Sequence, residues 1–326
     1  MLAIIIVLVF LSFVFWFEIY VSKKPGSEES VEYIVLKGRG DEEISKDLKE
    51  RGIIKSEYFF RGYVFFTFQD KKLQAGKYIL SPAMSVRQIV EKFVSGDVVK
   101  NRITIIEGWN VKDIAEYFEG KNISKKEDFI KLAGKDFSED FSFLSELPEK
   151  TSLEGYLFPD TYEILEGESA ENIVKIILAN FGKKITTELK EAAASEKKSI
   201  FEIITMASII EKEVKTIDDK KIVSGILWKR LEAGMPLQVD ATINYITGKN
   251  RSSALFKDIE IDSLYNTYKY RGLPLGPISN PGMDSILAAI YPTESKYWYY
   301  LSAKSGETVF SETLKKHNIA RSLYLK

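Results

Sequence analysis

The stretch from Ser199 to Val214, SIFEIITMASIIEKEV, carries two carboxylates for which a helix predicts different surroundings. At about 100° per residue, one apolar stripe contains Ile200, Ile203, Ile204, Ala207, Ile210 and Val214. Glu211 falls inside this stripe, about 20° from Ile204, whereas Glu213 points to the opposite side. We therefore expect Glu213 to be an ordinary solvated side chain and Glu211 to be set against apolar neighbours.

An apolar surrounding disfavours the charged form of a carboxyl group, so Glu211 is expected to hold its proton at neutral pH. A protonated carboxylic acid is what the cleavage of a glycosidic bond requires as its general acid. The alternative is a Glu near a helix end that pairs with one of the 46 Lys and Arg residues. The spacing alone leaves both interpretations open.

Composition excludes several classes of function. The net charge is −1, with 46 basic and 47 acidic residues, which gives no electrostatic footprint for nucleic acid. Cysteine is absent, so disulfides and thiolate chemistry are excluded. The single histidine, His317, cannot build a multi-histidine metal site or a conventional Ser-His-Asp triad. No motif calls for a metal or an organic cofactor, and 326 residues suffice for two domains with sizeable cores.

The N-terminus predicts a membrane anchor over residues 1–22. Met1 to Phe17, MLAIIIVLVFLSFVFWF, has no charged residue, and the run reaches the ~20 residues that span a bilayer. A cleavable signal peptide is the alternative, but no basic n-region precedes the run and no small-residue cleavage site follows it. Lys23 and Lys24 taken alone favour a cytoplasmic C-terminal side, although a large domain can translocate against so small a bias.

A polar linker, residues 23–30, leads to a small patterned module that we assign to residues 31–105. Three segments, GDEEISKDLKERGI, SVRQIVEKFVSGDV and NVKDIAEYFEGKNI, share a cap-like start, an Ile and a Leu or Phe four residues later. The pattern predicts small β–α units with helices that start at Asp41, Ser85 and Asn110. The preceding strands are expected at Tyr33–Leu36, Lys77–Leu80 and Arg102–Ile106. Any short amphipathic helix with a glycine cap would give the same pattern.

The remainder, residues 106–326, reads as helices with a few short strands. Residues 124–150 form a charged helical connection, and further helices are expected at Ala170–Phe181, Ile185–Ser195 and Ile217–Ala233. Near the end, strands at Tyr297–Ser302 and Thr308–Phe310 flank a turn with Gly306, and a helix follows at Ser311–Leu325.

Three segments of this part carry candidate site residues. TSLEGYLFPDTYEI (151–164) holds Glu154 and Asp160, which are either functional carboxylates or caps of turns. LQVDATINYITG (237–248) holds short polar side chains that suit the recognition of hydroxyls and amides, or equally helix capping. YNTYKYRGLPLGPISNPGMDSI (265–286) is a loop of a length that is uncommon unless it is functional. Pro281 behind Asn280 fits the first turn of a helix that runs through Ala289.

These motifs occur together in one order behind one anchor: LEGYLFPDTYEI, ASIIEKEV, KRLEAGMPLQVDATINY, YNTYKYRGLPLGPISNPG and YPTESKYWYYLSAKSGETVFSETLKKHN. The chain resembles the endolytic murein transglycosylases, the MltG or YceG-like family, strongly over residues 100–326. Residues 31–100 match the family's LysM-like module only loosely. The resemblance implies an α+β fold: an N-terminal transmembrane helix, a small LysM-like mixed α/β module, and a catalytic domain of helices with short antiparallel strands.

The resemblance also implies the reaction, which is cleavage of β-1,4 bonds between N-acetylmuramic acid and N-acetylglucosamine within nascent peptidoglycan strands. No water is consumed, and the products end in 1,6-anhydro-muramic acid. The family's catalytic Glu matches Glu211, which would act first as general acid and then as general base. The motifs suggest substrate-binding roles for further residues: Glu154, Tyr156, Gln238, Asp240, Thr242, Asn266, Tyr268 and Asn280. The substrate's N-acetyl group, or a polar residue such as Gln238 or Asp240, could stabilise the developing positive charge.

The family implies a bacterial cytoplasmic membrane protein with a single span and an extracytoplasmic catalytic domain. Its expected partners are glycan strands and, from the family alone, peptidoglycan synthases. Two alternatives stay open. One is a hydrolytic muramidase that pairs Glu211 with Glu154 or Asp240, as two-carboxylate enzymes do. The other is a non-catalytic, membrane-tethered peptidoglycan-binding scaffold.

Overall fold

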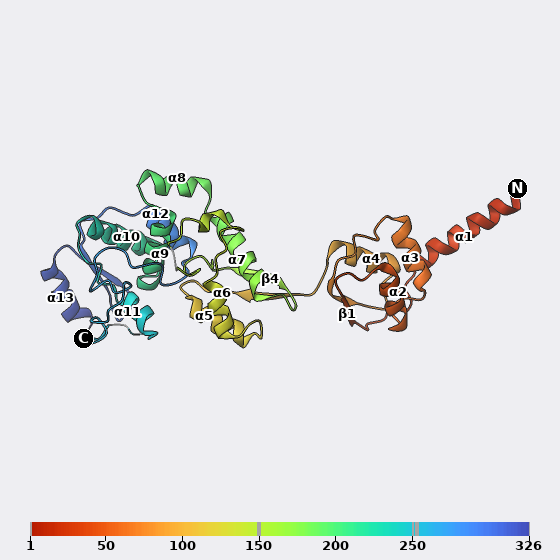
Figure 1. The fold of residues 1–326 in the computed structure, drawn as a ribbon, viewed down its shortest axis with the longest axis horizontal. Helices are drawn as coiled ribbons and strands as arrows, with labels where there is room; N and C mark the ends of the chain where they lie inside the picture. Colours follow the sequence, from red (N-terminus) through yellow and green to blue (C-terminus); the bar gives the residue numbers. More distant parts are fainter. Residues whose placement is uncertain (1, 149–150, 250, 252–253, 326) are drawn as a thin grey trace. The chain divides into compact units, whose positions relative to one another are not determined.

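The computed structural model describes residues 2–148, 151–249, 251 and 254–325, and its fold is mixed α+β (Figure 1). The chain forms two compact units. The first contains the residues up to Arg102 together with Glu163–Glu168, and the second contains Ile103–Tyr162 together with the residues from Ser169 onward. Each unit has its own elements and is described separately.

The first unit begins with α1 (Leu2–Tyr20), an apolar helix with a mean hydropathy of 2.8. By length and composition α1 can cross a membrane, although a signal sequence has the same properties. Ile19, near its C-terminal end, is fully buried in the core of the unit, whereas the side chains of residues 2–13 are exposed. The helix therefore joins the module only through its last turns (Figure 1).

The rest of the unit is a two-stranded sheet with three helices. Strands β1 (Val31–Val35) and β2 (Gly76–Leu80) are antiparallel, with Tyr33 opposite Tyr78. The helices are α2 (Asp41–Glu50), α3 (Glu57–Phe66) and α4 (Val86–Ser95). Helix α4 starts in a capping box of Ser85 and Gln88 and ends at Gly96, which has φ +68°. The predicted starts at Asp41 and Ser85 are confirmed to within a residue, but α3 was missed.

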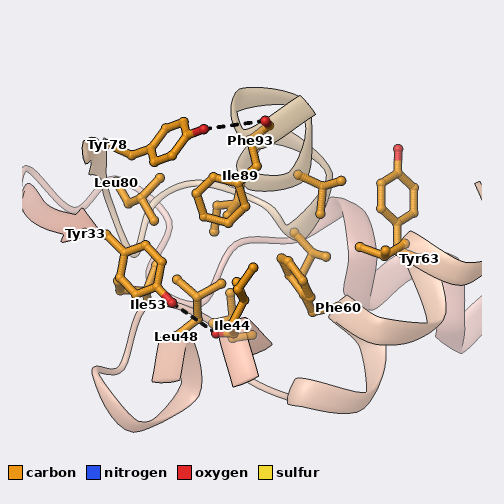
Figure 2. Close-up of a cluster of buried hydrophobic side chains, with 14 of the residues drawn as sticks. Tyr33, Ile44, Leu48, Ile53, Phe60, Tyr63, Tyr78, Leu80, Ile89 and Phe93 are labelled. Carbon is orange, nitrogen blue, oxygen red and sulfur yellow. Dashed lines mark hydrogen bonds between the residues drawn. The ribbon is translucent and has the colours of Figure 1, made fainter. Parts of the chain in front are cut away.

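The core of this unit is aromatic, as Figure 2 shows. Phe93 lies at its centre, with ring centroids 4.7 Å from Tyr78 and 5.9 Å from Tyr33. Both tyrosine hydroxyls donate to backbone carbonyls, that of Tyr33 to Ile44 at 3.3 Å and that of Tyr78 to Gln74 at 2.7 Å. The core thus buries large rings without leaving their hydroxyl groups unpaired.

Strands β3 (Lys100–Thr104) and β4 (Thr161–Leu165) pair with each other where the chain passes between the units. The predicted strand at Arg102–Ile106 is therefore shifted by two residues. In the second unit, β5 (Tyr299–Ser302) and β6 (Thr308–Ser311) form an antiparallel hairpin, as predicted.

The second unit is mainly helical, and α9 (Ile200–Glu213) lies at its centre. Every residue of α9 from Ile203 to Ile210 is buried, so the helix is enclosed on all sides rather than along one stripe. Helices α8, α10, α11 and α12 pack against it. The helices of this unit are α5 (Val111–Gly120), α6 (Lys126–Ala133), α7 (Ala170–Lys184), α8 (Thr187–Ser195), α9, α10 (Ile217–Glu232), α11 (Asp240–Thr247), α12 (Met283–Ile290) and α13 (Leu314–Tyr324).

Two predicted details of this unit are wrong. Helix α12 begins at Met283 with Gly282 as its N-cap, so Pro281 precedes the helix and does not occupy its first turn. Residues 240–247 form the helix α11, which the alternating pattern of residues 237–244 did not suggest. The predicted helical connection at 124–150 contains α6, and residues 149–150 lie outside the described part of the chain.

Candidate active site

Glu211 lies in the last turn of α9, and its carboxylate is paired with Lys220 of α10. Lys220 Nζ is 3.2 Å from Oε2 and 3.3 Å from Oε1 of Glu211. The side chains of Lys220 and Glu211 are only 5% and 9% exposed. A buried charge is tolerated only when it is paired and hydrogen-bonded. Here the Lys220 ammonium and the Glu211 carboxylate are each other's partner.

The start of α12 completes the surroundings of this carboxylate. The backbone N–H of Gly282 donates to Glu211 Oε2 at 3.1 Å, and the Ser285 hydroxyl donates to the same atom at 2.6 Å. Gly282 is the N-cap of α12, where the helix dipole favours negative charge. Glu211 therefore meets a cation and two hydrogen-bond donors, whereas the helical pattern predicted apolar neighbours.

The segment before α12 is held against α9 by a hydroxyl of that helix. Ser208, fully buried, accepts from the N–H of Ile278 at 3.0 Å through its Oγ. Its carbonyl accepts from the Ser279 hydroxyl at 3.1 Å. These contacts, one turn before Glu211, bring the start of α12 to the carboxylate.

A second carboxyl group, that of Glu107, lies against Gly282. A Cβ atom added to Gly282 would be 2.0 Å from Glu107 Oε1, so the glycine allows the Glu107 carboxyl group to lie in this position. Backbone bonds join the two segments, from Gly108 N to Asn280 O at 2.9 Å and from Asn280 N to Trp109 O at 2.7 Å. Desolvation raises the pKa of Glu107, and the charge of Glu211 raises it further.

Glu154 and Asn280 form a buried network that holds the same loop. Glu154, 3% exposed, accepts from the N–H of Val111 at 3.1 and 3.2 Å, from Asn280 Nδ2 at 3.2 Å and from the Tyr245 hydroxyl at 3.3 Å. Burial raises the pKa of Glu154 to about 8. Asn280 Oδ1 in turn accepts from Leu157 N at 2.8 Å. The network joins residues that lie 123 and 126 positions apart in the chain.

Tyr156, from the same sequence motif, packs in the interior. It is 2% exposed, and its ring centroid is 4.9 Å from that of Phe181 on α7. Burial raises the pKa of its hydroxyl well above the usual value. Tyr156, Glu154 and Asn280 are thus enclosed by protein, and the hydrogen bonds of Glu154 and Asn280 position the loop that carries Gly282.

The remaining predicted residues form a second group around the start of α11. The Tyr268 hydroxyl donates to Asp240 Oδ1 at 2.6 Å, and the hydroxyls of Thr242 and Thr267 lie 3.0 Å apart. Asn266, fully buried, donates from Nδ2 to the carbonyls of Ile259 and Ile261, both at 2.8 Å.

Gln238 is exposed and has φ +54°, an uncommon conformation for a residue other than glycine. Its backbone N–H donates to Thr267 O at 3.1 Å, which ties the segment before α11 to the loop of Asn266.

Glu213 belongs to this second group, and the expectation that it is an ordinary solvated side chain is wrong. It is hydrogen-bonded to the side chain of Tyr300 and to the backbone of Ala241. Burial and the nearby charge of Asp240 raise the pKa of Glu213 to about 7. The end of α9 thus presents one carboxylate to the start of α12 and another to the start of α11.

Four residues at the Glu211 carboxylate were missed from the sequence: Glu107, Lys220, Gly282 and Ser285. Lys220 lies nine positions from Glu211 and Ser285 lies 74 away, and neither shares an element with it. A weak signal existed for Ser285, because it is the one hydroxyl within the apolar run of MDSILAAI.

Comparison with known proteins identifies the family. The sequence model of the YceG-like family matches residues 33–322. The chain belongs to the YceG-like family. A relative from Bacillus subtilis named endolytic murein transglycosylase is 36% identical over 313 residues, which cover 92% of this chain and 86% of the relative.

Two further YceG-like relatives extend the comparison. An endolytic murein transglycosylase of Streptococcus pneumoniae is 29% identical over 326 residues, which cover 90% of this chain but only 59% of the pneumococcal protein. The crystal structure of a YceG-like protein from Listeria monocytogenes has a TM-score of 0.61 and 35% identity. The match covers 90% of this chain and all of the Listeria chain. The family resemblance seen in the motifs is confirmed.

Proposed function

We propose that this protein is an endolytic murein transglycosylase with Glu211 as its general acid and base. The single observation that carries the proposal is the position of Glu211, whose carboxylate is held by Lys220, Ser285 and Gly282 N–H in a chain of this family. The name of the Bacillus relative, which this chain matches over most of its length, supports the same activity.

In the proposed reaction, neutral Glu211 donates its proton to the glycosidic oxygen, and the bond to the anomeric carbon of the muramic acid breaks. An oxocarbenium-like centre develops on that carbon. The ionised Glu211 then takes the proton from the 6-hydroxyl of the same sugar, whose oxygen bonds to the anomeric carbon. The proton count balances, and no water enters.

The groups around Glu211 suit the stage of the reaction at which Glu211 takes the proton from the 6-hydroxyl. Lys220, Ser285 and the N–H of Gly282 bind the carboxyl oxygens of Glu211, the group that takes the proton from the 6-hydroxyl. They also fix its position, and a fixed base avoids reorganisation during the reaction. Glu107 is the neighbouring group suited to stabilise the positive anomeric carbon, in place of Gln238 or Asp240, which lie in the Glu213 group.

We further propose that α1 anchors the chain in the cytoplasmic membrane, with both units on the extracytoplasmic side. In this layout the first unit acts as the LysM-like module that contacts glycan, and the anchor keeps the second unit near nascent strands. Peptidoglycan synthases are the expected protein partners.

A two-carboxylate muramidase is the second candidate, and Glu107 is the observation that favours it. A hydrolase needs a second carboxylate to activate water or to act as nucleophile. Glu107 lies beside the Glu211 site, whereas Glu154 is enclosed in a structural network and Asp240 binds Tyr268. The products of the two reactions differ in mass, since hydrolysis adds one water for each bond cleaved and the fragment with the new muramic acid end is heavier by that water.

The test incubates the full chain, held in detergent, with uncrosslinked glycan strands and analyses the products by mass spectrometry. Anhydro-ended fragments are expected from the unchanged protein. Glu211→Gln is expected to lose roughly 10²–10⁴-fold in rate, because an amide keeps the shape but cannot exchange the proton. The matched control is Glu191→Gln on the exposed face of α8, which should cleave normally.

Each alternative has its own outcome. Products heavier by one water would show that the protein is a muramidase and not a transglycosylase. Glycan binding without cleavage by the unchanged protein would leave the scaffold as the function. Full activity of the Glu211→Gln variant would show that Glu211 takes no part in the chemistry.

A further inference from the structure

Helix α3 of the first unit has an exposed aromatic face that its own core does not use. Phe60 and Val64 of α3 are fully buried. The other face and the turn after it expose four large rings, which we call the aromatic patch: Tyr58 (71% exposed), Phe65 (71%), Phe66 (63%) and Phe68 (79%). The rings of Phe65 and Phe66 contact each other, with centroids 5.6 Å apart, and exposed apolar surface of this kind marks an interaction site with a protein or a membrane.

The aromatic patch is continuous with the membrane helix α1, because α3 packs directly on it. The ring of Phe15 on α1 lies 5.9 Å from that of Phe59 and 5.6 Å from that of Phe66. A Cβ atom on Gly62 would be 2.8 Å from Phe15 Cε2, so a glycine at this position lets the two helices approach closely.

The contacts also fix the level of the patch along α1. Lys55, just before α3, is paired with Glu18 at 3.1 Å, and Glu18 is the first charged residue of α1. Phe66, near the end of α3, instead contacts Phe15, which is about 4.5 Å closer to the apolar end at 1.5 Å per residue. Because Phe59, near the start of α3, contacts the same Phe15 ring, α3 crosses α1 close to the level of Phe15, about one helical turn from the first charged residue.

Phe68 and the residues after it extend the patch in a way that suits a lipid surface. Phe68 follows the C-cap of α3 and has φ +55°, the left-handed conformation in which helices commonly end, with Gln69 N donating to Val64 O at 3.0 Å; this turn leaves its ring 79% exposed. Lys71 and Lys72, both exposed, follow within four residues. Aromatic rings beside lysines are typical of segments that bind the interface of an anionic bilayer.

We propose that the aromatic patch docks on the bilayer, with Phe65, Phe66 and Phe68 inserted at the boundary between headgroups and acyl chains. The proposal rests on the membrane anchoring stated under the proposed function, and not on the transglycosylase activity. It follows that α1 does not act as a flexible tether for the first unit. The first unit has one fixed orientation on the membrane, set by α1, α3 and the two lysines.

The absence of cysteine allows a direct test with single-cysteine variants of the full chain. Phe65→Cys and Phe68→Cys report on the patch, and Phe10→Cys reports on α1. Ile34→Cys is the matched control, since Ile34 is an exposed apolar residue of β1, and the strand lies away from α1 in Figure 1. Each variant carries a nitroxide spin label and is reconstituted into phosphatidylcholine vesicles that contain phosphatidylglycerol.

The measurement compares relaxation of the label by oxygen, which concentrates in lipid, with relaxation by a water-soluble nickel chelate. Labels at positions 65, 68 and 10 are expected to respond mainly to oxygen, and the label at position 34 mainly to the chelate. A parallel preparation carries Ile34→Cys together with Phe68→Ser. If loss of the Phe68 ring unfolds the unit, the label at position 34 becomes highly mobile in this preparation.

Contrary outcomes separate the two proposals. If position 10 is in lipid while 65 and 68 respond to the chelate, the anchor stands and the docking proposal fails. If position 10 responds to the chelate, both fail. If 65 and 68 are shielded from both reagents and the shielding disappears on dilution of the protein in lipid, a second copy of the chain covers the patch, which also overturns the proposal.

Discussion

Lys220 Nζ lies 3.2 Å from Glu211 Oε2, and the protein encloses both side chains almost completely. The pair links the end of α9 to α10, and Ser285 and Gly282 link the same carboxylate to α12. One charged group is thus the meeting point of three helices that pack against each other. Its removal should affect the stability of the second unit as well as the chemistry.

The first prediction concerns this ion pair. Lys220→Met leaves the Glu211 charge buried without its cation, which we expect to lower the free energy of unfolding by about 3–5 kcal/mol. Adding Glu211→Gln to Lys220→Met should recover part of this loss, because the unpaired charge is then gone. Urea unfolding followed by tryptophan fluorescence measures both effects. Lys221→Met, next along α10 but less buried, is the control. Equal losses from Lys220→Met and Lys221→Met would contradict the argument.

The second prediction separates Glu107 from Glu211. Gly282→Ala places a Cβ 2.0 Å from Glu107 Oε1, so the exposed Glu107 side chain must swing away at little cost in stability. If Glu107 stabilises the transition state, Gly282→Ala and Glu107→Gln should each lower kcat/KM on the order of 10²-fold. The double variant should lose little more, because both changes remove one interaction.

The control for this pair is Gly120→Ala, where an added Cβ meets nothing within 4 Å. Initial rates on glycan strands provide the measurement. An unchanged rate for Gly282→Ala, or losses that multiply in the double variant, would show that Glu107 takes no part in the reaction.

The third prediction concerns Gly155, the glycine within residues 153–156 (LEGY). Gly155 has φ +88°, and a Cβ there would lie 2.6 Å from Pro277 Cγ and 2.8 Å from Ile204 Cγ2. Gly155→Ala therefore combines a left-handed backbone, which costs about 1–2 kcal/mol, with overpacking, which costs about 1–3 kcal/mol. Gly234→Ala has φ +63° with open space around it, and it should show only the smaller backbone cost. Thermal unfolding of the two variants tests this order, and an equal loss would refute the packing part.

The fourth prediction concerns pH and Glu213. The pKa of Glu213 is about 7 in the folded chain, above the ordinary value of 4.5. As pH rises from 4.5 to 7, the unfolded chain loses this proton while the folded chain keeps it, so stability falls across that window. At about 1.4 kcal/mol per pKa unit, the loss amounts to no more than about 3.5 kcal/mol.

Glu213→Gln should remove this contribution, so the stability of the variant relative to the unchanged protein should rise between pH 4.5 and 7 and then level off. Denaturation midpoints at a series of pH values provide the measurement. The exposed Glu191→Gln serves as the control, and its difference from the unchanged protein should not vary with pH in this window. A constant difference for Glu213→Gln would contradict the predicted proton uptake.

Local signals in the sequence were enough for many elements. Ser85 and Ser199 each begin a helix with a capping box, and both α4 and α9 start at the next residue. The uncharged run of α1 and the hairpin of β5 and β6 follow from composition and alternation. The sequence pattern does not predict helix α3. Its aromatic rings face the core, α1 and the exterior, so its apolar residues do not form one stripe.

The sequence by itself determined the family, through its ordered motifs, and it singled out Glu211. The surroundings of that residue came only from the tertiary structure. Helical periodicity tells which face a side chain occupies, but α9 is buried on every side, and the pattern cannot tell an apolar neighbour from Lys220. The same limit made Glu213 look solvated, although α11 and β5 cover it. The character of a buried carboxylate depends on groups that are distant in the chain, and only their packing decides which of them it meets.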